Sequence, residues 1–224
     1  GAYALDNYGT AEISGGTLTN SDVRTAVHAV ADSSGAISTT TLSGSVICKG
    51  DIQVDGSMTA GSTMNKAELA ISSGTINGSV NVGSFSKVAL SGGTFAGGVE
   101  ETPGTSQGNE ISVTGGIYPQ KPDDAYLAGD ALVILAKSQF YVGEDAEKRI
   151  SSAQSGETLE VVHGKEVTDV PAGVTVENKT GAAITVNGET VAPGGSITIP
   201  APEQPSEPSN PSFTEPTYYP DYDE

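Results

Sequence analysis

The chain has 224 residues, of which 29 are glycine and 12 are proline, and its formal net charge is −18 at pH 7. This length fits one elongated domain or two small ones. The excess of acids repels the phosphate backbone of nucleic acids, whose binding depends on Lys and Arg, and the sequence shows neither a polybasic patch nor a long apolar run. We therefore expect neither nucleic-acid binding nor membrane insertion of this fragment.

One phrase recurs along the first half of the chain. Each copy is a short β-prone run, a corner of small residues and a second β-prone run; the copies occupy residues 13–18, 42–46, 71–76, 90–95 and 113–118. Val, Ile and Thr favour pleated, half-buried positions, and glycine lets the chain bend without a Cβ atom in the way. One such unit cannot bury its own apolar face, whereas stacked copies can.

The repeat predicts an all-β fold whose copies stack as the turns of a parallel β-helix, a solenoid. The copies begin 29, 29, 19 and 23 residues apart, which fits loops of varying length better than a strict short period. The alternative is an antiparallel β-sandwich, since short strands and Gly-rich turns are also typical of that fold. Asn77-Gly78 favours this alternative, because Asn-Gly between strands indicates a hairpin; in a β-helix the pair would form a corner.

Composition divides the chain into four parts. They are β-helix turns (1–118), a helical turn with strands and a capping helix (119–156), a C-terminal β region (157–199) and a Pro-rich acidic tail (200–224). Proline at the density of the tail predicts an extended spacer with no core of its own.

The second part contains the best helix signal of the chain. After a turn through Tyr126 and strands at 131–136 and 139–142, residues 144–153 begin with acids and carry Lys148 and Arg149 later, which is typical of a helix. We expect this helix to cover the open end of the strand stack, where backbone groups would otherwise stay unpaired. In the third part, Asn187-Gly188 predicts a hairpin.

Acidic residues supply the few candidates for metal or catalytic chemistry. Asp51 and Asp55 are four positions apart around a strand-like run, so both would point to the same face of a strand and together offer oxygen ligands to Ca²⁺. A solvated edge is the simpler interpretation, and no other cofactor is expected. Glu100 and Glu101 are the remaining carboxylates that we would test for catalysis.

Two histidines and one cysteine complete the set of reactive residues. His28 lies on an alternating run and is expected to be a half-exposed strand residue rather than a ligand; His163 is expected to face solvent. Cys48 is the only cysteine, so an intrachain disulfide is excluded. Its strand-like surroundings predict a buried, inert thiol.

The repeat phrases carry a resemblance to a known family. The phrases I-S-G-G-T-L, L-S-G-G-T-F and I-S-V-T-G-G-I-Y, followed by P-D-D-A-Y-L-A-G, are similar to repeats of large adhesin-like surface proteins of gut-dwelling Gram-positive bacteria. The resemblance covers most of residues 3–199 and departs from the family at 117–119, where Thr-Phe-Ser is usual. It implies a right-handed, pectin-lyase-like parallel β-helix, secreted and displayed on the cell wall, with the tail as a spacer toward an anchor. It supplies no catalytic residue, because the shared letters are strand and corner residues.

These observations lead to three functional hypotheses. The first is a non-enzymatic extracellular module of the cell surface or cell wall, a rigid stalk or adhesin-like display domain whose partners would be host or plant glycans or surface proteins. The second is a carbohydrate-binding module that presents an exposed row of Tyr3, Tyr8 and Tyr118. The third is a polysaccharide lyase or glycoside hydrolase, which is disfavoured because a glycosidase needs two carboxylates across a cleft and the acids here are spread along loops.

Overall fold

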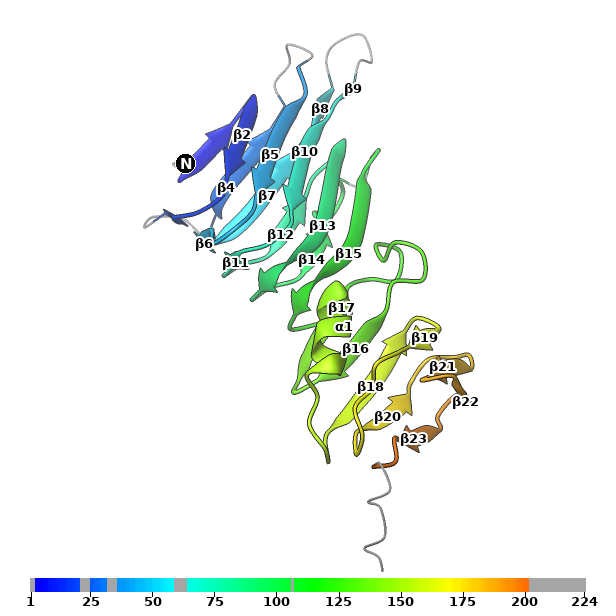
Figure 1. Cartoon of the computed structure of the whole chain (residues 1–224). Helices are drawn as coiled ribbons and strands as arrows, with labels where there is room; N and C mark the ends of the chain where they lie inside the picture. Colours follow the sequence, from blue (N-terminus) through cyan, green and yellow to red (C-terminus); the bar gives the residue numbers. More distant parts are fainter. Residues whose placement is uncertain (1–2, 21–24, 32–35, 59–63, 106, 202–224) are drawn as a thin grey trace, which may run out of the picture.

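The computed structural model describes residues 3–20, 25–31, 36–58, 64–105 and 107–201. Over these ranges the chain is predominantly β-strand with a single α-helix, which confirms the all-β prediction. Figure 1 shows an upper body that holds β1 to β15 and a lower body that holds β16 to β23, with α1 beside their junction. Within the same ranges, no helix is long and apolar enough to cross a membrane. The predicted spacer at 200–224 lies, except for its first two residues, outside the described part of the chain.

Two series of parallel strands build the upper body. The first series is a five-stranded sheet in the order β1 (Leu5–Asn7), β4 (Thr25–Val30), β7 (Asp51–Asp55), β12 (Val80–Val82) and β14 (Val99–Glu101). The second series belongs to a larger sheet and runs in the order β2 (Thr10–Ile13), β5 (Ser38–Leu42), β10 (Ala67–Ile71), β13 (Ser86–Phe95) and β15 (Glu110–Tyr118). Each successive stretch of chain thus gives one strand to each series.

Short strands extend this arrangement at its margins. Parallel pairs join β3 (Thr17–Thr19) to β6 (Ile47–Lys49), β6 to β11 (Thr75–Ile76), and β11 to the end of β13. An antiparallel pair joins β8 (Ser57–Met58) to β9 (Met64–Asn65).

The copies of the repeat phrase lie side by side and run in the same direction. In the second series Leu42 is opposite Ile13 and Ile71, and Leu90 is opposite Ile71 and Val113. The antiparallel-sandwich alternative is therefore wrong for the upper body.

Asn77-Gly78 is a corner and not a hairpin. The strand before it, β11, pairs with β6 and β13, whereas the strand after it, β12, pairs with β7 and β14 in the other sheet. The hairpin interpretation fails because Ile76, directly before the pair, and Val80, two residues after it, are both fully buried in different sheets and do not pair with each other.

Aliphatic side chains from both sheets fill the space between them. The burial of β13 alternates along the strand, and Leu42, Ile71, Leu90 and Val113 are at most 1% exposed. A second hydrophobic cluster fills the lower body, and the two clusters meet at β16 (Val133–Ala136), where Val133 belongs to the first and Ile134 to the second.

Cys48 lies in the upper cluster and is fully buried, as predicted. Burial, and secondarily the nearby Asp51 carboxylate, raises the pKa of the Cys48 thiol to about 11. The thiolate is the nucleophile, so we expect iodoacetamide at pH 8 to modify the native chain at least ~100-fold more slowly than the chain in guanidinium chloride. Mass spectrometry of timed samples measures both rates. Equal rates would show that the native upper body opens to the reagent.

Backbone groups from later in the chain cover the free edge of β15. The first half of this edge meets residues 126–128, where the Val113 N–H donates to the Tyr126 carbonyl (2.7 Å) and the Ala128 N–H donates to the Val113 carbonyl (3.2 Å). The second half pairs antiparallel with β17 (Gln139–Gly143). The turn expected through Tyr126 is present as a single turn closed by the Tyr126 N–H and the Asp123 carbonyl.

The sheet then continues into the lower body. Antiparallel pairs link β17 to β16 and β16 to β18 (Thr158–His163); β20 (Thr175–Asn178) follows in parallel and β23 (Ser196–Thr198) antiparallel. A three-stranded sheet has the order β19 (Glu166–Val167), β21 (Ile184–Val186), β22 (Glu189–Val191). The predicted hairpin at Asn187-Gly188 is confirmed: Val186 pairs with Glu189, and the two turn residues have φ of 45° and 88°.

The predicted helix is present as α1 (Glu144–Ser151), with Ala146 and Ile150 buried. Its first turn meets β15, where an Asp145 carboxylate oxygen accepts a hydrogen bond from the Gly116 N–H at 2.8 Å. The expectation that this helix closes the open end of the stack needs correction, because the backbone of β17 and residues 126–128 pair with the β15 edge directly. The helix packs instead over the second cluster.

Glu157 joins three elements of the lower body through ion pairs. Its carboxylate lies 2.7 Å from an Arg149 guanidinium nitrogen on α1 and 2.9 Å from Lys137 Nζ in the β16–β17 turn. These two cations lower the pKa of Glu157 from its ordinary value to about 2.

A carboxyl whose pKa is lowered in the folded state stabilises the fold above its unfolded pKa and loses this contribution as the pH falls toward the folded value. We therefore expect Glu157 to lose its contribution between about pH 4.5 and pH 2. The melting temperatures of the parent chain and of Glu157→Gln, measured from pH 6 to pH 2, should converge over this interval. An exposed control, Glu189→Gln, should track the parent. A constant gap between Glu157→Gln and the parent would contradict the expectation.

Candidate functional site

Asp51 and Asp55 share the outer face of β7, as predicted, because Ile52 and Val54 between them point into the core. Their carboxylates are engaged separately. Asp51 Oδ1 accepts a hydrogen bond from the Ser79 N–H at 2.8 Å, whereas Asp55 faces Gln53 and His28. Among the described residues, no group of three or more His, Cys, Asp or Glu side chains is placed to hold a metal ion.

His28 lies between two carboxylates. Its Nδ1 is 3.0 Å from Asp6 Oδ1, its Nε2 is 3.2 Å from Asp55 Oδ2, and its side chain is 14% exposed, so it is more covered than the half-exposed strand residue we predicted. The Tyr3 ring packs on the imidazole with centroids 4.6 Å apart. A neutral imidazole donates from one nitrogen, whereas an imidazolium donates from both. Because both ring nitrogens of His28 face carboxylates, neither nitrogen is free to accept a proton from a hydroxyl group. The cluster of Asp6, His28 and Asp55 instead joins strands β1, β4 and β7.

The His28 cluster belongs to a polar row that crosses the whole five-stranded sheet. Neighbouring residues of this row are paired in register, and its members are Asp6, His28, Gln53, Asn81 and Glu100. Sequence reasoning missed the row because its members are about 20 to 30 residues apart and only the strand register brings them together.

The tyrosine row predicted for carbohydrate binding does not form. The Tyr118 side chain is 1% exposed, stacks on Phe95 with centroids 4.7 Å apart, and donates a hydrogen bond to the Gly115 carbonyl at 2.9 Å. Burial raises the pKa of Tyr118 well above its ordinary value. Tyr8 is 52% exposed and Tyr3 lies on His28, so at most two of the three rings are available to a sugar.

Glu100 and Glu101 do not face each other across a cleft. Glu100 continues the polar row opposite Asn81, and Glu101 accepts a hydrogen bond from Asn109 Nδ2 at 2.9 Å. Glu101 also borders a groove of about 430 Å³ on the outside of β13 and β15, together with Lys87 and Tyr126. Partial burial, followed by the charge of Glu101, raises the pKa of Tyr126. Our sequence reasoning gave Tyr126 only a place in a turn.

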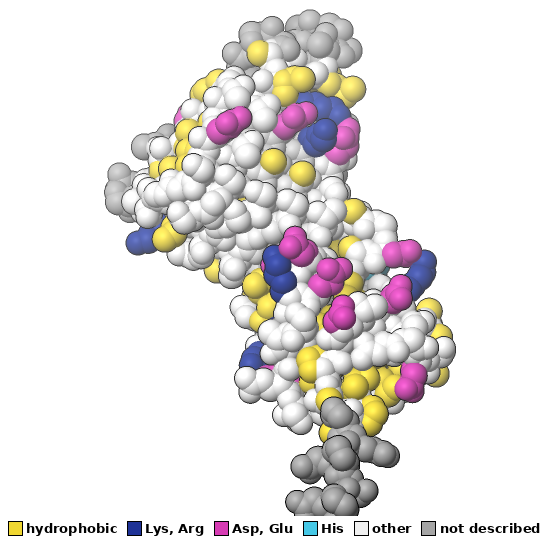
Figure 2. Space-filling view, in the orientation of Figure 1, with side chains coloured by type: hydrophobic (Ala, Val, Ile, Leu, Met, Phe, Trp, Pro, Cys, Tyr) yellow, Lys and Arg dark blue, Asp and Glu magenta, His cyan; other side chains and the backbone are white. Residues whose placement is uncertain are grey.

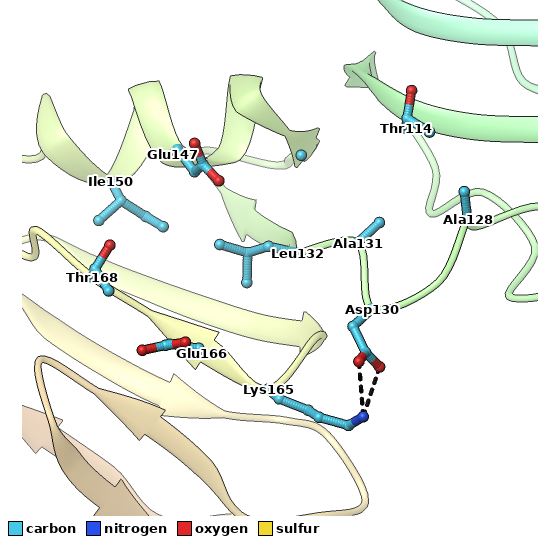
Figure 3. A pocket seen from close by; sticks show the side chains of 11 residues that line it. Thr114, Ala128, Asp130, Ala131, Leu132, Glu147, Ile150, Lys165, Glu166 and Thr168 are labelled. Atoms are coloured by element: carbon cyan, nitrogen blue, oxygen red, sulfur yellow. Dashed lines mark hydrogen bonds and ion pairs between the residues drawn. The ribbon is translucent and has the colours of Figure 1, made fainter.

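A larger crevice of about 640 Å³ lies at the junction of the two bodies. Figure 3 shows Glu147 on α1 and Glu166 on β19, with the apolar side chains of Leu132 and Ile150 between the two elements. At one end Lys165 Nζ lies 2.8 Å and 2.9 Å from the two carboxylate oxygens of Asp130. His163, expected to face solvent, is partly buried nearby and its Nδ1 lies 2.7 Å from the Ala131 carbonyl oxygen.

Charged side chains on the visible face of the molecule form small mixed groups and not one large patch (Figure 2). Oppositely charged side chains pair at Lys66–Glu110, Lys87–Glu68 and Lys148–Glu144. Most carboxylates singled out from the sequence thus contact a neighbouring strand or a nearby base. The crevice and the groove are larger than two further hollows of about 340 Å³ and 220 Å³, and they are the candidates for a ligand site. Comparisons of the chain with protein-family models, with curated protein sequences and with solved structures find no match.

Proposed function

We propose that the chain is a non-enzymatic display module of an extracellular cell surface, and that residues 3–118 wind as a right-handed parallel β-helix that serves as its rigid stalk. The observation that carries the proposal is the contact between corners of neighbouring repeats. A Cβ atom on Gly92 would lie 2.3 Å from the Ser72 carbonyl oxygen, and one on Gly115 would lie 2.2 Å from that of Ser91. Glycine is needed there because one backbone lies directly on the next.

The parallel pairing supports the same assignment. Strands alternate between the two series along the chain, and crossovers between parallel strands of one sheet are almost always right-handed. Each repeat then contacts only its neighbours, so stiffness accumulates along the stack. The polar row and the Lys87–Glu68 ion pair fit a stalk, because they join neighbouring strands and do not converge on a reaction centre.

A distance measurement tests the rigid stack. Glu12, Thr41, Ala70, Ala89 and Ser112 are opposite one another in consecutive strands, so the first and last backbones should lie about 19 Å apart at about 4.8 Å per step. Spin labels on Glu12→Cys and Ser112→Cys, with Cys48 buried, should give one narrow distribution near that distance plus the length of the labels. A broad or two-peaked distribution would contradict a rigid stack.

A turnover screen tests the absence of enzymatic activity. Pectins and glucans, with and without calcium, should yield neither new reducing ends nor unsaturated products. Turnover that disappears in Asp51→Asn/Asp55→Asn or in Glu100→Gln/Glu101→Gln would overturn the proposal and assign the chemistry to those carboxylates.

The groove beside Tyr126 favours carbohydrate binding as a second candidate. An aromatic ring with nearby amide and charged groups suits a sugar, and the groove offers Tyr126, Asn109 and Lys87 together. A glycan array would then show ligands that Tyr126→Ala loses and that Tyr8→Ala, at an exposed ring outside the groove, retains. Equal loss in both variants, or no binding by the parent chain, would count against this candidate.

A further inference from the structure

The crevice between the two bodies contains two carboxylates that no cation of the chain neutralises. The bases around them already have acidic partners: Lys165 pairs with Asp130, Lys148 with Glu144 and Arg149 with Glu157. Neither Glu147 nor Glu166 has an ion pair or side-chain hydrogen bond within the described part of the chain. Two negative charges therefore border one hollow without a counterion from the protein.

Apolar surface separates these two charges. Leu132 is half-buried and presents apolar surface to the hollow between α1 and β19, whereas Ile150 also lines this hollow but is only 1% exposed (Figure 3). Lys and Arg side chains have the matching construction, an aliphatic stem with a charged end. A bare metal ion would gain nothing from the apolar wall.

The walls of the crevice are held in place by hydrogen bonds. The Ala131 N–H donates to the Ala128 carbonyl at 3.3 Å, and the Gly143 N–H donates to the Leu132 carbonyl at 2.8 Å. The Asp130–Lys165 pair ties the 128–132 segment to the start of β19. The site is thus preformed, which limits the ordering that a ligand would have to impose.

The neighbouring strand indicates an extended polypeptide as the occupant. Glu166 of β19 and the flanking residues Lys165 and Thr168 line the crevice, and β19 is an edge strand of the described three-stranded sheet. An edge strand presents backbone N–H and C=O groups to which an extended segment adds as a further strand. A volume of about 640 Å³ also accommodates more than one side chain.

We propose that this crevice binds a basic, extended segment of a partner protein, with a Lys or Arg side chain lying across Leu132 and its charge between Glu147 and Glu166. The net charge of −18 attracts such a segment from a distance, while the crevice selects its orientation. The proposal does not depend on the β-helix assignment, because the residues from which it is argued lie at 128–168, after the last repeat phrase.

A labelled nine-residue peptide of alternating Lys and Val is the probe, and fluorescence anisotropy near physiological salt measures its binding. We expect Glu147→Gln/Glu166→Gln to weaken binding at least 10-fold. Glu12→Gln/Glu189→Gln removes the same charge from two exposed sites elsewhere and should weaken it less than 2-fold. Replacing Lys by norleucine in the peptide should abolish binding.

Three outcomes would overturn the proposal. Equal weakening by the two double variants would reduce the interaction to diffuse attraction by an acidic surface. Spermidine that competes as well as the unlabelled peptide would make the occupant a small polyamine. Absence of probe binding at millimolar concentration would contradict the proposed peptide site. The spin-label and turnover experiments test the stalk proposal separately, so their results would not change.

Discussion

Replacing Leu90 with aspartate is expected to abolish the cooperative thermal unfolding of the chain. Leu90 is 1% exposed and lies between Ile71 and Val113 on the neighbouring strands. An ionised carboxylate there has no partner, and burying an unpaired charge costs several kcal/mol or more, against a total stability of about 5–15 kcal/mol. Circular dichroism during heating measures the transition, and Leu90→Ala should give an intermediate loss of about 2–5 kcal/mol.

The adjacent residue supplies a matched control. Ala89 is exposed on the outer face of the same strand, so Ala89→Asp introduces the same charge one position away and should change the stability by no more than about 0.5 kcal/mol. If Leu90→Asp melts within a few degrees of Ala89→Asp, the alternation of β13 into the core is wrong. An equally severe loss in Ala89→Asp would show that the outer face is covered.

The local chemistry of the sequence was enough to predict the elements whose signals are short-range. The acidic start of α1 and the hairpin at Asn187-Gly188 are examples. The same dipeptide at Asn77-Gly78 is a corner, because the following strand β12 pairs with β7 in the five-stranded sheet and not with the preceding strand β11. The dipeptide itself does not reveal this pairing. The hairpin between β16 and β17 had no signal at all: Lys137 and Ser138 adopt φ of 50° and 62° without a glycine.

The candidate site was harder to predict because it depends on register. Asp6, His28 and Asp55 come together only because β1, β4 and β7 are aligned in parallel. The prediction that the Tyr118 ring is exposed was wrong. The alternation of inward and outward side chains along a strand cannot be followed from the sequence through a glycine corner. The pairing of β13 with β15 shifts between Leu90 and Thr94, and this shift accompanies the change of side that carries the Tyr118 ring into the core.

The second large effect is expected for alanine substitutions at glycines. Gly115→Ala and Gly9→Ala should change the free energy of unfolding in opposite directions. A Cβ atom on Gly115 would lie 2.2 Å from the Ser91 carbonyl oxygen and 2.7 Å from its carbonyl carbon, whereas one on Gly9 would meet nothing within 4 Å. Neither glycine has a positive φ. Backbone atoms cannot rotate away, so Gly115→Ala should lower the free energy of unfolding by about 1–3 kcal/mol or more. Gly9→Ala should raise it by about 0.4–1 kcal/mol, because alanine restricts the unfolded chain.

The opposite signs separate two explanations of the repeat phrase. If the glycines of the phrase served only to let the chain turn, alanine at Gly115, which is in the phrase, would act mainly through the unfolded state, as alanine does at Gly9 outside it. The two variants would then shift the urea midpoints alike. If neighbouring repeats lie directly on each other, only the glycine in contact is intolerant. Urea titration of Gly115→Ala, Gly92→Ala and Gly9→Ala measures this difference, since Gly92 faces the Ser72 carbonyl oxygen at 2.3 Å in the same way. Stabilisation of all three would remove the contact on which the proposed stalk rests.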